Sequence, residues 1–168
     1  MLTFVRLDRP AEAAELLERF LAGRRPAAWQ VLAEVVQSQV RRPQYLGDMP
    51  HTWIGSEYAR TIWGMLMHEG DGVLELLPGT PPAWVEGGGL AVSALPTAHG
   101  TLGLRARREG DVLTIELDPG LRPDVAVRAF WPGRVAPTTV TVDGAVVKGA
   151  DARGIRLERP FRRLVARW

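Results

Sequence analysis

The sequence predicts an α+β protein in which an N-terminal helical segment is followed by an antiparallel β-sandwich. Up to about residue 70, apolar residues recur at the three- and four-residue spacing of amphipathic helices. Beyond that point they alternate with polar residues, and turn residues recur about every eight to twelve positions, a pattern typical of sandwiches. Prolines and a run of three glycines interrupt both patterns near residues 70–88. We therefore predict a helical region over residues 1–70 and a sandwich over residues 71–168.

Three helices are expected in the first region, each marked by residues that begin or end helices. Asp8 is placed to cap the first helix, which has Pro10 in its first turn and Gly23 at its end. Gly70 follows the third helix. Residues 1–7 are interpreted as a separate final helical turn. The predicted helices cover about residues 8–23, 26–43 and 53–68.

Nine strands are expected in the second region. Two hairpins are marked by their turn residues, Gly110-Asp111 and Asp143-Gly144, and the second pair is the strongest hairpin signal in the chain. No internal repeat is apparent. The predicted strands cover residues 73–77, 90–95, 101–107, 111–117, 125–131, 138–142, 145–148, 155–158 and 162–167.

Composition excludes several classes of function. The net charge is only +2 and the arginines alternate with acids along the chain, so no nucleic-acid partner is expected. The absence of cysteine excludes disulfides and thiolate catalysis, and the three histidines are too far apart in sequence to predict a metal site. No cofactor is expected. No segment approaches the roughly 20 apolar residues that span a bilayer. As written, the chain is expected in the cytoplasm, or outside it if it belongs to a longer exported precursor.

The densest group of potentially functional residues, Tyr45 to Glu57, leads into the third predicted helix. A helix amino end offers free N–H groups, and aromatic faces beside carboxylates suit a sugar ring. A structural interpretation is favoured on composition alone: Asp48 or Thr52 caps the helix, and the aromatic residues belong to the core. The candidate binding residues are Asp48, His51, Trp53 and Glu57.

Glu34 is a second candidate because it falls in the middle of the second predicted helix, among apolar residues. A carboxylate in that position either faces water or is buried, and a buried carboxylate with a tuned pKa could serve as a general base. The solvent-facing interpretation is favoured.

Three tryptophans of the sandwich region could line a sugar-binding face. Indoles in a small sandwich more often serve core or interdomain packing. We favour packing for all three, which are Trp84, Trp131 and Trp168.

Several short motifs follow one another in a set order. His51 leads into an amphipathic helix, and three stretches follow it: Leu74-Glu75-Leu76-Leu77-Pro78, Ala94-Leu95-Pro96-Thr97-Ala98-His99-Gly100-Thr101-Leu102, and Arg107-Arg108-Glu109-Gly110-Asp111-Val112-Leu113. This order resembles the end of bacterial α-L-rhamnosidase-type glycoside hydrolases, and is also similar to bacterial proteins that carry discoidin (coagulation factor 5/8 type) domains. The resemblance extends from about Arg25 to Pro132.

The resemblance implies a fold and a set of roles. In those families an (α/α)6 barrel carries the active site and a β-sandwich follows it, so residues 1–70 would be part of such a barrel. Glu34 resembles the general base, and His51 resembles a histidine that lines the sugar subsite. By the same resemblance, subsite contacts would come from Asp48, Trp53 and Glu57.

A complete catalytic site is not expected in this chain. Inverting glycoside hydrolysis needs two carboxylates about 6.5–9.5 Å apart, whereas the sequence offers one candidate base and three of about twelve barrel helices. We therefore expect a carboxy-terminal fragment of a glycoside hydrolase-like protein that is not catalytic alone. The alternatives are a non-catalytic module for protein interaction or glycan binding, and a decayed product that only folds. The expected partners are a saccharide and, because apolar helix stripes would be exposed, a second copy or a separate barrel portion.

Overall fold

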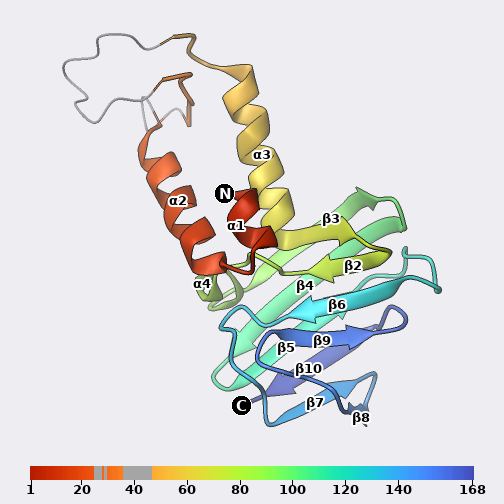
Figure 1. Cartoon of the computed structure of the whole chain (residues 1–168). Helices are drawn as coiled ribbons and strands as arrows, with labels where there is room; N and C mark the ends of the chain where they lie inside the picture. Colours follow the sequence, from red (N-terminus) through yellow and green to blue (C-terminus); the bar gives the residue numbers. More distant parts are fainter. Residues whose placement is uncertain (25–27, 29, 36–46) are drawn as a thin grey trace.

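The computed structural model describes residues 1–24, 28, 30–35 and 47–168 and contains both helices and β-sheets (Figure 1). Helices α2 and α3 extend away from one end of the sheets, and α1 lies between them (Figure 1). The α+β class predicted from the sequence is therefore confirmed. The helices of the described residues are α1 (Leu2–Arg6), α2 (Pro10–Ala22), α3 (Thr52–Leu66) and α4 (Pro82–Val85). None of them is long and apolar enough to cross a bilayer.

The strands form two sheets. A four-stranded sheet has the order β1-β2-β6-β9, and a six-stranded sheet has the order β3-β4-β5-β10-β7-β8. The first contains β1 (Met67–Gly70), β2 (Val73–Leu76), β6 (Ala126–Phe130) and β9 (Gly154–Leu157). The second contains β3 (Leu90–Thr97), β4 (Gly100–Glu109), β5 (Val112–Leu117), β7 (Thr139–Val142), β8 (Ala145–Val147) and β10 (Arg163–Arg167).

All nine predicted strands are present within a few residues of their expected bounds, and β1 is an additional strand. The strand pairs are antiparallel with one exception, the parallel pair of β2 and β6. These two strands are separated in sequence by β3, β4 and β5, which belong to the other sheet. The chain therefore leaves the small sheet and returns to it, so the direction of β6 is not fixed by a hairpin.

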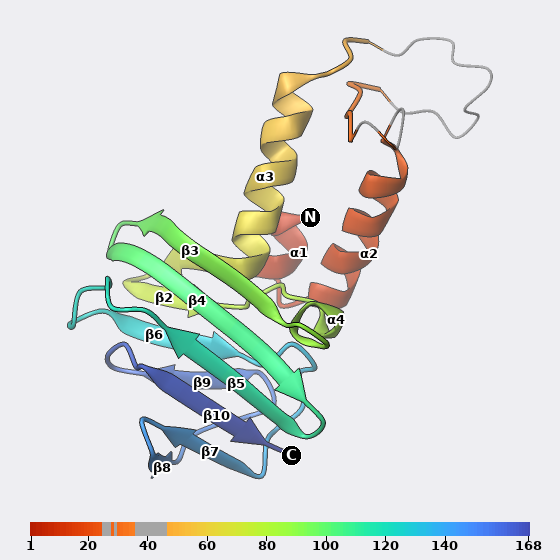
Figure 2. The same ribbon diagram turned by 180° about the vertical axis from the view of Figure 1, so that it is seen from behind.

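The two sheets face each other across one hydrophobic core (Figure 2). Leu74 and Leu76 of β2 are fully buried in this core together with Ile115 of β5 and Leu164 of β10. Residues of β5 alternate between buried and half-buried, as expected when a strand turns one face toward a core. In β5 the period-two pattern of the sequence thus marks the residues that face the core.

The Asp143-Gly144 hairpin forms as predicted, with Val142 paired to Ala145 across the two-residue turn. Both turn residues have positive φ, 50° and 86°, which is the backbone geometry of a type I′ turn. The Asp143 carboxylate also accepts hydrogen bonds from the backbone N–H groups of Arg162 and Arg163. The Asp therefore both shapes the hairpin and ties it to the start of β10.

Helix α2 begins at Pro10 and is followed by Gly23, as the sequence predicts, but Asp8 is not its cap. The N-cap residue is Arg9, and Asp8 adopts φ 57°. The Asp8 carboxylate instead binds Arg134 and Arg153, which lie beside the small sheet. The capping prediction is wrong because Asp8 lies one residue before the N-cap and its carboxylate is held by these two guanidinium groups. The helical turn expected over residues 1–7 is confirmed as α1.

The second predicted helix is wrong over residues 30–35, the main stretch of it that the structure describes. Residues 30–35 are not helical, and the remainder of the prediction lies mainly outside the described residues. The backbone N–H of Glu34 donates to the carbonyl of Asp48, and that of His51 donates to the carbonyl of Leu32. These bonds to a distant segment replace the local bonds of a helix, which sequence periodicity cannot foresee.

Helix α3 ends at Leu66, two residues before the predicted end, because the chain enters β1 there. The backbone groups of Met67–Gly70 pair with β2 instead of continuing the helix. His68 is consequently a strand residue, and the sheet begins before residue 70.

A second, smaller apolar cluster holds α1, α2 and α3 together. Its buried members are Val5, Ala13, Leu17 and Met65, and Trp84 packs against it. The rings of Phe20 and Tyr58 stack with centroids 6.1 Å apart, linking α2 to α3.

The tryptophans of the sandwich region serve packing, as predicted. Trp131 is fully buried, and its indole N–H donates to the carbonyl of Asp151. Trp168 meets it edge-on, with centroids 6.1 Å apart, and packs against the main core. A buried ring such as Trp131 cannot stack on a sugar.

Candidate functional site

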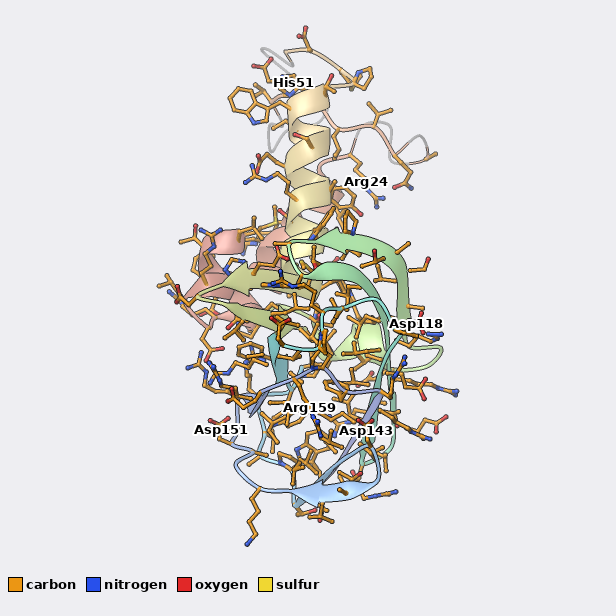
Figure 3. All side chains as sticks on the ribbon, turned by 90° about the vertical axis from the view of Figure 1, so that its right-hand side faces the viewer. Arg24, His51, Asp118, Asp143, Asp151 and Arg159 are labelled. Atoms are coloured by element: carbon orange, nitrogen blue, oxygen red, sulfur yellow. The ribbon has the colours of Figure 1, made fainter. Side chains whose placement is uncertain are left out.

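The predicted binding residues lie around the amino end of α3, the end directed away from the sheets (Figure 3). His51 is the N-cap residue of this helix, and its Nδ1 accepts a hydrogen bond from the backbone N–H of Ile54 at 3.3 Å. An accepting Nδ1 requires that a neutral imidazole carry its proton on Nε2. That nitrogen is left to donate to a ligand or to water.

Glu34 approaches the same helix end from the preceding segment. Its carboxylate accepts a hydrogen bond from the backbone N–H of Asp48 at 3.2 Å, and its own N–H donates to the Asp48 carbonyl at 3.1 Å. A Cβ placed on Gly47, which has φ 64°, would collide with the Glu34 side chain. Glycine at position 47 is thus what allows the carboxylate to lie against this loop.

The other three predicted residues are exposed or half-buried. Asp48 and Trp53 are exposed, and 71% of Trp53 is accessible to solvent. The Glu57 carboxylate accepts a hydrogen bond from Arg60 at 2.6 Å on the same helix. The structure therefore brings Glu34, Asp48 and His51 together at the amino end of α3, where Trp53 is the second helical residue, while Glu57 lies about one turn farther along the helix. Tyr45 lies outside the described residues.

This arrangement favours hydrogen bonding over acid–base catalysis. The Glu34 side chain is exposed, so it lies in water and not in the dry pocket that stabilises charge in an active site. Glu57, the acid of α3, is paired with Arg60. The site offers a carboxylate and an imidazole N–H to a polar ligand in a water-exposed setting, where electrostatic stabilisation of a developing charge is weak.

A polar hollow lies where the helices meet the outer face of the small sheet. It measures about 270 Å³, and charged and polar side chains from the α1–α2 loop, β1 and β2 line it, including Asp8, His68 and Glu75. His68 lies opposite Glu75 in the β1–β2 register, and Glu75 lies opposite Arg128 in the β2–β6 register. The three side chains thus form one row across neighbouring strands.

Arginines surround the ring of Phe130 beside this hollow. The guanidinium carbons of Arg134, Arg128 and Arg153 lie 4.7, 5.3 and 6.0 Å from the ring centroid. Burial lowers the pKa of Arg134, and the nearby charge of Asp8 opposes that shift. The Nε of Arg128 is buried and has no hydrogen-bond partner among the described residues.

This hollow was not predicted from the sequence. His68 was expected in a helix, and the alignment of Glu75 with Arg128 depends on the parallel β2–β6 pair. The only available signal was a single charged residue in each of two otherwise apolar strands, Glu75 in β2 and Arg128 in β6, which marks an outward face but not its neighbours. Comparison with known proteins finds no matching family model and no matching curated protein.

Proposed function

We propose that this chain is the carboxy-terminal part of a glycoside hydrolase-like, carbohydrate-active protein of the bacterial α-L-rhamnosidase type. In this proposal the helical segment belongs to an α/α barrel, the two facing sheets are the β-sandwich that follows it, and this part does not hydrolyse glycosides by itself. A saccharide is the ligand proposed for the amino end of α3.

The order of the elements supports the proposal, because helices precede two sheets that share one core. The resemblance of the motifs between Arg25 and Pro132 supplies the carbohydrate class. The helices also pack through only a small cluster of buried residues, which suits a segment made to lie against further helices.

The position of Glu34 is the observation that supports a chain unable to hydrolyse glycosides by itself. Its exposed carboxylate is bonded to the Asp48 backbone, and the nearest acid along α3, Glu57, is bound to Arg60. Hydrolysis with inversion would need a second carboxyl group across the scissile bond and a dry site.

Two measurements on the purified chain test this proposal. Hydrolysis of an aryl α-L-rhamnoside should be no faster with the wild-type protein than with Glu34→Gln. Titration calorimetry with L-rhamnose should show weak binding that is lost in Glu34→Gln and His51→Ala. Glu15→Gln, which changes an exposed acid on α2, serves as the matched control and should bind like wild type.

Either result could contradict part of the proposal. Robust turnover that Glu34→Gln abolishes would show that the chain is a catalyst in its own right. Binding that survives both substitutions would show that the saccharide binds elsewhere than at the amino end of α3. Because His51 caps α3, the helical content of His51→Ala must be checked by circular dichroism before lost binding is assigned to the site.

The second candidate is a non-catalytic module for protein interaction. The observation in its favour is the exposure of two tryptophans on α3, Trp53 and Trp63, which are 71% and 39% accessible. Large exposed apolar side chains grouped on one helix face are typical of interaction surfaces. Absence of any saccharide binding would favour this candidate.

A further inference from the structure

One face of α3 carries a row of exposed side chains, of which Trp63 also donates a hydrogen bond from its indole N–H to the Met67 sulfur at 2.7 Å. Trp53, Ser56, Arg60 and Trp63 are all exposed. At 3.6 residues per turn they fall on the same side of the helix, about opposite the side that packs on α1 and α2 through Tyr58 and Met65. We call these four residues the α3 stripe.

The α3 stripe is self-complementary when a second helix runs antiparallel to it. The spacing from Trp53 to Ser56 equals the spacing from Arg60 to Trp63, so reversing the helix direction leaves the pattern of positions unchanged. A two-fold axis near residue 58 places Trp53 of one copy level with Trp63 of the other. A contact in which residue i meets residue j and j meets i is the requirement for an isologous dimer.

Charge complementarity points the same way. The same two-fold axis places Glu57 within about 1.5 Å, measured along the helix axis, of the level of Arg60 of the second copy. Glu57 and Arg60 already form an exposed ion pair within one helix, with side chains 40% and 66% accessible. Two copies would combine these pairs into a four-membered network of alternating charge. The exposed Ser56 and Ala59 near the centre are small enough to let the helices approach closely.

We infer that α3 is the contact helix of a two-fold symmetric dimer of this chain, with Trp53 packed on Trp63 of the second copy and Glu57 paired with Arg60 of the second copy. The inference goes beyond the proposed function, and its test uses no sugar. Helix α3 is about 22 Å long, so the contact is smaller than the roughly 800 Å² per partner of a standard stable interface. The dimer is therefore a dissociating one.

Sedimentation velocity over about a hundredfold range of protein concentration tests the inference, because mass action governs a dissociating dimer. Wild type should shift from monomer to dimer as concentration rises. Trp53→Ser should weaken the dimer. Glu57→Arg and Arg60→Glu should each weaken it at least about tenfold, since each brings like charges together across the interface.

The charge variants allow a test by recombination. Mixing Glu57→Arg with Arg60→Glu in equal amounts pairs a doubly positive helix with a doubly negative one. A heterodimer should therefore form at concentrations where each variant alone is mostly monomeric. Arg19→Glu, which places like charges on the exposed face of α2, is the matched control and should dimerise like wild type. Circular dichroism of every variant checks that the helices are retained.

Two outcomes would overturn the inference. If the wild-type chain remained monomeric at every concentration, the α3 stripe would not be a dimer contact. It would then be available to a different polypeptide, such as a separate barrel portion. A dimer that tolerates both charge reversals, with no preference for the mixture, would be held by some other surface.

Discussion

Replacing Asp8 by Asn should destabilise the protein, because the Asp8 carboxylate joins the helical segment to the small sheet. One carboxylate oxygen accepts hydrogen bonds from Arg134 at 3.1 Å, and the other pairs with Arg153 at 2.7 Å. Asn has nearly the same shape and tolerates the positive φ of 57° at this position, so the substitution removes the charge without adding backbone strain.

The expected loss is about 2 kcal/mol in the free energy of unfolding. Removing one partner of a fully buried ion pair costs about 3–5 kcal/mol, and exposed pairs contribute only about 0–1 kcal/mol. The Arg134 and Asp8 side chains are 19% and 28% accessible, which places this contact between the two limits. Arg134 would keep its bonds to the carbonyls of Pro78 and Trp131, so part of its charge would remain solvated by the protein.

Urea denaturation followed by circular dichroism measures this loss as a lower midpoint at an unchanged slope. The matched control is Glu15→Gln, which breaks an exposed pair on α2 and should change stability by less than about 0.5 kcal/mol. If Asp8→Asn were as stable as this control, the contact between helix loop and sheet would not stabilise the fold, and the reasoning would be refuted.

Two further predictions concern the sheets. The backbone N–H groups of Gly154 and Arg153 donate to the Asp151 carboxylate and hold its pKa below the ordinary 3.8. These hydrogen bonds therefore stabilise the folded protein above pH 3.8, and their contribution is lost as the pH falls through the folded-state pKa. Asp151→Asn should therefore flatten the dependence of stability on acid pH, measured by urea unfolding at a series of pH values; an unchanged slope would contradict it. Gly144→Val should lower the free energy of unfolding by about 1–2 kcal/mol because Gly144 has φ 86°, whereas Gly88→Val should change it little. Equal urea midpoints for the two variants would contradict the expected strain in the turn.

The sheet region was predictable because much of it forms through neighbours in sequence. Strands β4 and β5 are joined by a two-residue turn, as are β7 and β8, so alternation and turn residues alone locate them. Helices α2 and α3 were equally visible, because each has an apolar stripe and a recognisable end. In these elements the local signals and the final structure agree.

The errors occur where a distant segment supplies the hydrogen bonds. Glu34 was expected in a helix, but it bonds to Asp48, which lies 14 residues away in the sequence. No periodic pattern in the sequence indicates that contact. His68 was expected to continue α3, but pairing with Glu75 of β2 draws it into a strand. Both expectations followed helical spacing, and both were overridden by a partner elsewhere in the chain.

The candidate sites divide in the same way. The sequence alone determined which residues carry suitable chemistry at the start of α3, because His51, Asp48 and the preceding carboxylate are recognisable by type and position. Only the tertiary structure decided that Glu34 and Asp48 are exposed, and that Asp8, His68 and Glu75 line a separate hollow against the small sheet. Side-chain chemistry is a property of single residues, whereas enclosure and charge pairing depend on contacts between segments far apart in the chain.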